Sequence, residues 1–110
     1  MTVRRVFVIW TDPLFHESVR LLLKHPDIIW VGAAANLETA REEIMRLHPN
    51  TILFEKTRDG FPADLMGILE TETWDLRIIE LSFDTNEMIL YHRERQMVVE
   101  AGDLVKFVLS

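Results

Sequence analysis

The chain has 110 residues and a formal net charge of −6 with its histidines neutral, and this length is typical of a single domain. The negative charge argues against binding to nucleic acid or to anionic lipid, and the absence of cysteine excludes disulfides and zinc–thiolate sites. No apolar run approaches the ~18 residues that span a bilayer and the amino-terminal residues read as a strand rather than a signal peptide, so we expect one cytoplasmic domain over residues 1–110.

The first strand and helix are marked by composition and by a capping signal. Val3 to Trp10 is a continuous apolar run, typical of a strand that is covered on both faces. Asp12-Pro13 predicts a helix start. Aspartate accepts hydrogen bonds from the free amides of the first turn, and the backbone N–H that proline lacks has no partner within the helix at this position. Residues 25–27 end this helix, whose apolar side chains recur at helical spacing: Phe15, Val19, Leu22 and Leu23.

The alternation of strand and helix continues to about residue 82. Residues 28–34 predict a second buried strand, and Asn36 is a plausible cap for a helix that ends at 48–50 and buries Leu37, Ala40, Ile44 and Leu47. Residues 51–54 and 76–82 predict two further strands, separated by a loop and by a helix over 63–70 that buries Leu65, Ile68 and Leu69. This pattern indicates right-handed crossovers and a parallel sheet with helices on both faces.

The last quarter of the chain breaks the alternation. Residues 87–91 and 96–99 are short apolar strand candidates with no room for a crossover helix, so they predict an antiparallel hairpin, followed by a short helix over 101–109. One face of the hairpin needs a cover from this helix or from a second copy of the chain, and an open hairpin edge can add strands across a dimer. We therefore expect a homodimer, with these interface residues: Met88, Leu90, Tyr91, Arg93, Arg95 and Met97.

Several short segments, in order and at matching spacing, resemble the receiver domain of two-component response regulators. The segments are distributed over about three quarters of the chain: residues 13–15, 26–28, 31–36, 46–50 and 81–82. The resemblance implies a three-layer α/β fold of flavodoxin-like type, with parallel strand order 2-1-3-4 and the antiparallel hairpin at one edge.

The same resemblance points to a phosphorylation site that has lost its acids. In receivers, two adjacent acids after the first strand hold magnesium, and an aspartate that ends the third strand accepts the phosphoryl group. Here these positions read Trp10 and Thr11, and Glu55. Asp12 lies one position further on and is expected to cap the helix, while Ser82 matches the hydroxyl residue of the family. Without the carboxylate cluster that magnesium needs, these five residues form a degenerate pocket.

Two of these residues leave alternatives open. Glu55 can resemble a permanently phosphorylated state or can be a solvated residue at a strand end. Trp10 can fill the volume that the lost metal site vacates, or it can line a small pocket at the carboxyl ends of the strands and bind a flat ligand there. Trp30 and Trp74 are interpreted as packing residues.

The remaining residues offer no catalytic constellation. The four histidines have no ligand-like spacing, the four glycines are scattered singly, and no serine lies in a nucleophile-elbow context. We therefore expect no metal, no cofactor and no enzymatic activity. The leading hypothesis is a stand-alone pseudo-receiver, a phosphorylation-independent signalling or protein-interaction module. The alternatives are a sensor of a planar small molecule near Trp10, and a residual phospho-acceptor that uses Asp12 or Glu55.

Overall fold

The computed structural model describes residues 3–92, 95–100, 102 and 104–109. Strands and helices alternate up to β4, and a hairpin and a short helix follow. In chain order the elements are β1 (Arg4–Ile9), α1 (Pro13–Leu22), β2 (Ile28–Ala34), α2 (Leu37–Leu47), β3 (Thr51–Glu55), α3 (Ala63–Thr71), β4 (Arg77–Ser82), β5 (Glu87–His92), β6 (Arg95–Glu100) and α4 (Leu104–Leu109).

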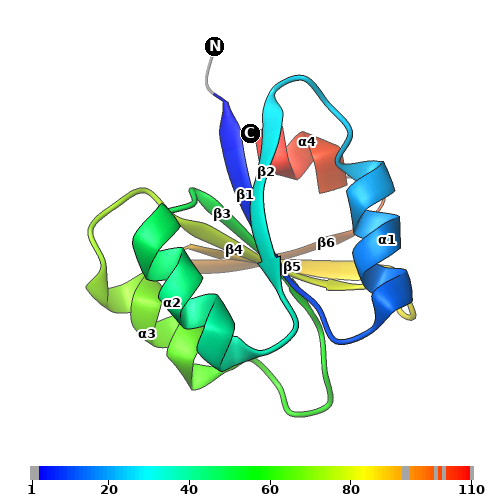
Figure 1. The fold of residues 1–110 in the computed structure, drawn as a ribbon. Helices are drawn as coiled ribbons and strands as arrows, with labels where there is room; N and C mark the ends of the chain where they lie inside the picture. Colours follow the sequence, from blue (N-terminus) through cyan, green and yellow to red (C-terminus); the bar gives the residue numbers. More distant parts are fainter. Residues whose placement is uncertain (1–2, 93–94, 101, 103, 110) are drawn as a thin grey trace.

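All strands belong to one six-stranded sheet with the order β2-β1-β3-β4-β5-β6. The first four strands in this order are parallel, and β4, β5 and β6 pair antiparallel. Figure 1 shows α2 and α3 on one face of the sheet and α1 and α4 on the other. The predicted α/β class, the parallel order 2-1-3-4 and the carboxyl-terminal hairpin are therefore confirmed.

Each face of the sheet has its own hydrophobic core, and β1 contributes to both. Val6 and Val8 pack with α1 and α4, whereas Phe7 and Ile9 pack with α2 and α3. Successive residues of a strand point to opposite faces, so a strand that is covered on both sides reads as an uninterrupted apolar run. This explains the composition of residues 3–10.

The predicted helix caps are present. The Asp12 side chain accepts a hydrogen bond from the Leu14 amide at 2.9 Å, and the Asn36 side chain accepts one from the Thr39 amide at 2.8 Å. Three expected core residues are not fully buried: Leu37 and Leu47 are half-buried, and Leu22 is 45% exposed. The buried side of α1 follows positions four residues apart, at 15, 19 and 23, and this places position 22 on the flank of the helix.

Strand β2 is less buried than expected, because it lies at one edge of the sheet. Its Ile29 side chain is 49% exposed. Its pairing with β1 shifts register between Val6 and Phe7. Gly32 lies directly against the Phe7 ring, where a β-carbon would come within 2.9 Å of a ring atom. A side chain at this position would therefore require the Phe7 ring to shift.

The chain itself covers both faces of β5, the first strand of the hairpin. Met88 and Leu90 are 0% and 2% exposed and share a core with α4, so the final helix supplies the cover on that side. On the other side Tyr91 packs against the Phe61 ring, with a centroid distance of 4.1 Å. These three side chains are therefore buried within the folded chain and are not available for the predicted dimer interface.

The other three predicted interface residues are less well defined. Arg93 lies outside the described residues, and only the backbone of Arg95 and Met97 is described, within β6. The expected helix at 101–109 is described from Leu104 onward. Within the described part of the chain, no helix has the length and apolar character that crossing a bilayer requires.

Candidate functional site

The carboxyl ends of β3 and β4 and the start of α1 surround a cavity of about 370 Å³, which we call the strand-end cavity. It contains three of the five predicted pocket residues, Asp12, Glu55 and Ser82. This is the edge at which open parallel sheets bind ligands. The full lining is Asp12, Leu14, Phe15, Ser18, Glu55, Lys56, Leu81, Ser82, Phe83 and Asp84.

The Glu55 carboxylate is bound by backbone amides. Its Oε1 accepts hydrogen bonds from the amides of Thr11 and Asp12, at 2.8 and 3.0 Å. Both donors belong to the loop that leads into α1, where the helix dipole and the free amides favour a negative charge. Glu55 thus ties the end of β3 to the β1–α1 loop, and it is not merely a solvated residue at a strand end.

The other two polar side chains of the predicted pocket serve the local backbone. The Asp12 carboxylate caps α1 through the Leu14 amide, at 2.9 Å. The Ser82 hydroxyl oxygen accepts from the Thr85 amide at 3.4 Å, which supports the turn between β4 and β5. Both side chains line the cavity, yet each already has a structural role.

Trp10 and Thr11 do not line the strand-end cavity. Thr11 is exposed and contributes its backbone amide, whereas the Trp10 ring lies 5.0 Å from the ring of His16 on α1. The reason is the parity of β1: Val8 points toward α1, so Trp10, two residues later, points the same way. Trp10 therefore neither fills nor lines the cavity, contrary to expectation.

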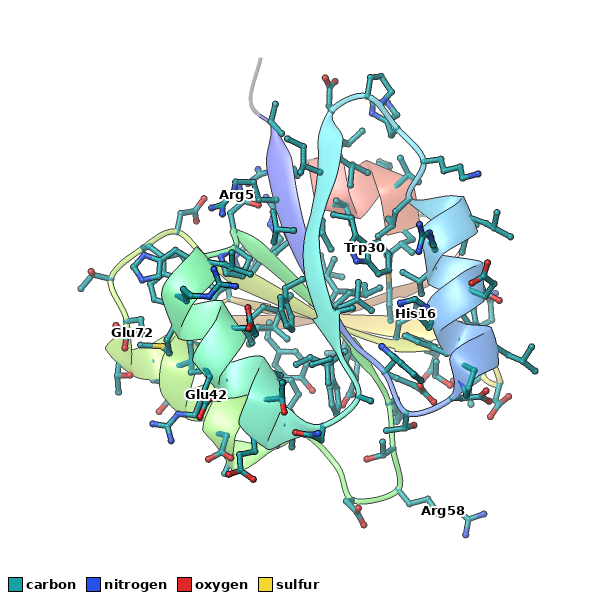
Figure 2. The ribbon with its side chains drawn as sticks, in the orientation of Figure 1. Arg5, His16, Trp30, Glu42, Arg58 and Glu72 are labelled. Atoms are coloured by element: carbon teal, nitrogen blue, oxygen red, sulfur yellow. The ribbon has the colours of Figure 1, made fainter. Side chains whose placement is uncertain are left out.

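His16 lies between two tryptophans rather than in solvent. Its ring is 5.0 Å from Trp10 and 5.4 Å from Trp30, in an edge-on arrangement with the latter. Figure 2 shows Trp30 and His16 in the space between β2 and α1. Trp74 packs differently: it stacks on His48 at 4.2 Å and donates from its indole nitrogen to the Pro49 carbonyl at 2.7 Å.

Seven further cavity residues were not predicted as site residues: Leu14, Phe15, Ser18, Lys56, Leu81, Phe83 and Asp84. Four of them lie within two positions of Glu55 or Ser82, which sequence reasoning did select: Lys56, Leu81, Phe83 and Asp84. A signal was available, because residues just beyond the carboxyl ends of parallel strands converge at one edge of the sheet.

A buried acid lies on β4, beside the strand that Glu55 ends. Glu80 is only 4% exposed, and its burial raises the pKa of the carboxyl, opposed by the charge of Lys56 and by a hydrogen bond from the Tyr91 hydroxyl. Burial, followed by the charge and the hydrogen bond of Glu80, raises the pKa of Tyr91. The two side chains form a buried acid–phenol pair beneath Phe61.

The cavity does not assemble a metal-binding carboxylate cluster. Among the described residues, no group of three or more histidine, aspartate and glutamate side chains is arranged to hold a metal ion. The strand-end cavity offers a mixed lining of acids, one lysine, hydroxyls and apolar side chains.

Comparison with known proteins supports the fold. No protein-family model matches the chain, and no curated protein matches it significantly. A crystal structure of a mutant of the anti-anti-sigma factor PhyR from Bartonella quintana is similar, with a TM-score of 0.59 and 18% identity over 71% of this chain. The match spans 33% of that longer chain, which contains a receiver-like domain. This similarity establishes a receiver-like, flavodoxin-like fold.

Proposed function

We propose that the chain is a receiver-like signalling module that acts through protein contacts and does not depend on phosphorylation. The observation that carries this proposal is the Glu55 carboxylate, held at 2.8 and 3.0 Å by the amides of Thr11 and Asp12. A fixed negative charge at this position ties β3 to the start of α1 without any transferred phosphoryl group.

The surroundings of Glu55 support the same conclusion. A receiver needs a carboxylate cluster that holds magnesium next to the acceptor. In this chain Trp10 and Thr11 occupy the positions of the two adjacent acids of receivers. The Trp10 side chain points toward α1, and Thr11 is exposed. The remaining acid, Asp12, is engaged in capping α1. We therefore propose a non-enzymatic module.

An exposed apolar surface on α1 is the part of the molecule best suited to a protein partner. Leu14 and Leu21 are 76% and 60% exposed, and they lie seven residues apart, on one side of the helix. Phe83, at 40% exposure, contacts the Phe15 ring of α1 at 5.4 Å. Exposed apolar side chains that gather in this way are typical of interaction sites.

The deciding experiment is thermal unfolding with magnesium alone and with magnesium plus beryllofluoride, a phosphoryl mimic. A ligand that binds only the folded state raises the melting temperature by mass action. We expect no shift that requires both ions. A clear rise with both would show a working phosphorylation pocket and would overturn the proposal.

The same measurement tests a second candidate, a residual phospho-acceptor. It is favoured by the presence of Lys56 and Ser82 in the strand-end cavity, because a cation and a hydroxyl are groups that bind phosphoryl oxygens. Incubation with acetyl phosphate provides a second test. Acid-labile phosphate on the protein would support this candidate, and its absence would reject it.

Homodimerisation is a further part of the proposal. It now rests on β6, the last strand of the sheet, whose outer edge is not paired with any described strand and is therefore open to strand addition. Sedimentation equilibrium at increasing protein concentration is expected to give a mass above that of one chain, 12.9 kDa. A constant mass of one chain would remove the dimer from the proposal.

A further inference from the structure

A second cavity, of about 330 Å³, lies between the end of α1 and the edge strand β2. We call it the α1–β2 pocket. Its lining residues are Arg20, Leu23, Lys24, Ile28 and Trp30, and none of them lines the strand-end cavity. It is therefore independent of the site around Glu55.

The floor of the α1–β2 pocket is apolar and held in place by its neighbours. Leu23 is 4% exposed and belongs to the core, and the partly buried Ile28 and Trp30 pack against the same core. His16 meets the Trp30 ring edge-on at 5.4 Å, with an interplanar angle of 85°, and Figure 2 shows both side chains between β2 and α1. The indole is thus positioned before any ligand arrives, which lowers the entropic cost of binding.

The rim of the pocket is positive. Arg20 and Lys24 are both exposed, they lie four positions apart, and no acid is among the lining residues. Within the described part of the chain, neither cation forms an ion pair. Like charges at this spacing repel each other. An anion bound between the two side chains would relieve this repulsion. The charged lining residues are both positive, although the chain has a net charge of −6.

We propose that the α1–β2 pocket binds a small aromatic anion. Its ring would pack on Trp30, Ile28 and Leu23, and its carboxylate, sulfonate or phosphate group would lie between Arg20 and Lys24. A cavity of about 330 Å³ is at the lower end of the ~300–1,000 Å³ that ligand pockets occupy, so it accommodates one ring system rather than an extended chain. This site goes beyond the proposed signalling function and does not rest on it.

The test is titration with 1-naphthoate, followed by the indole N–H signals of the three tryptophans in ¹⁵N-labelled protein. We expect the Trp30 signal to shift and saturate, and the Trp74 signal, whose indole donates to Pro49 at 2.7 Å away from this pocket, to stay in place. The neutral analogue 1-naphthalenemethanol is expected to bind about tenfold more weakly, because it lacks the charge-assisted contacts.

Two matched double variants separate this site from general electrostatic attraction. Arg20→Gln with Lys24→Gln is expected to weaken 1-naphthoate binding about tenfold. Arg41→Gln with Arg58→Gln removes the same charge from exposed positions elsewhere and is expected to leave the affinity unchanged. Failure of Trp30 to shift, equal affinity for the neutral analogue, or equal loss in both variants would overturn the proposal. The beryllofluoride experiment is unaffected by any of these outcomes.

Discussion

Glu55 and Glu80 lie on the adjacent strands β3 and β4, and the sheet accommodates their carboxylates in opposite ways. Glu55 ends its strand at the rim, where two backbone amides bind it. Glu80 lies inside β4, opposite Phe54 of β3, and is 4% exposed. At the end of β3 the Glu55 carboxylate accepts hydrogen bonds from two backbone amides of the loop between β1 and α1. In the interior the charge is penalised by burial, which raises the pKa.

This difference shows that the position of an acid along its strand determines what the acid does. The Glu55 carboxylate connects the end of β3 to the loop before α1, and it lines a cavity that is open to solvent. The interior carboxylate depends on neighbours that cannot be removed without leaving it unsatisfied, chiefly the Tyr91 hydroxyl and the charge of Lys56. We therefore expect large effects of substitution around Glu80 and modest ones around Glu55.

The largest effect is expected at Tyr91. Tyr91→Ala removes a ring that is 8% exposed and packs on Phe61, and it deprives Glu80 of a hydrogen-bond donor. Truncation of a buried aromatic side chain costs about 3–5 kcal/mol, measured as the free energy of unfolding in urea. Tyr91→Phe keeps the ring and should cost only about 1 kcal/mol. If Tyr91→Ala lowered the free energy of unfolding by less than about 1 kcal/mol, the proposed difference between the surroundings of Glu80 and Glu55 would be wrong.

A smaller effect is expected at the rim. Glu55→Ala removes the acceptor of two backbone amides, which water can partly replace, so it should cost about 1–2 kcal/mol in urea unfolding. The amide signals of Thr11 and Asp12 should shift at the same time. Asp84→Ala is the matched control, since it removes a carboxylate from the same cavity and should cost less than about 0.5 kcal/mol. Equal losses in the two variants would show that the Glu55 contacts do not stabilise the fold.

The pH dependence of stability should separate the interior acid from all exposed ones. Burial raises the folded-state pKa of Glu80 above its usual 4.5. Between the unfolded-state pKa of Glu80, about 4.5, and its raised folded-state pKa, the folded protein binds more protons than the unfolded chain. The contribution of Glu80 to stability therefore falls as pH rises through this range. The wild type should therefore lose stability relative to Glu80→Gln as pH increases from about 4.5 toward the raised pKa. Urea unfolding of both proteins at several pH values measures this, and a constant difference would contradict it.

Local signals in the sequence predicted the elements of this fold well. Asp12-Pro13 and Asn36 mark helix starts through contacts within three residues, and such contacts can be read without knowing the tertiary structure. The exposure of β2 was not predicted. The predicted strand order places β2 at an edge of the sheet, but the greater exposure of Ile29 that follows from this position was not inferred.

The candidate site was predictable in its place but not in its contacts. The convergence of Asp12, Glu55 and Ser82 follows from the parallel sheet. The direction of Trp10 depends on the parity of β1, which an uninterrupted apolar run does not reveal because both of its faces are buried. The amides that bind Glu55 come from residues more than forty positions away in the chain, and only the register between β1 and β3 brings them together.

A combined substitution tests whether magnesium binding can be restored at the carboxyl ends of β1 and β3. Thr11→Asp combined with Glu55→Asp would place three carboxylates, including that of Asp12, at the carboxyl ends of β1 and β3. The shorter side chain at position 55 should release the amides of the loop, and the added acid should repel its neighbours until a dication binds. At a magnesium concentration about tenfold above the dissociation constant, the gain is about 1.4 kcal/mol, visible as a rise in melting temperature that the wild type lacks.

Each single variant is the control for this combination. Glu55→Asp alone leaves Thr11 unable to supply a carboxylate, and Thr11→Asp alone leaves the Glu55 carboxylate bound to the loop amides, so neither should respond to magnesium. A response in Glu55→Asp alone would mean that Asp12 gives up its cap on α1 to bind the ion. In that case the side chain of Glu55, which is one methylene longer than that of aspartate, would be what prevents magnesium binding. The loss of the acidic pair at Trp10 and Thr11 would then not be the cause.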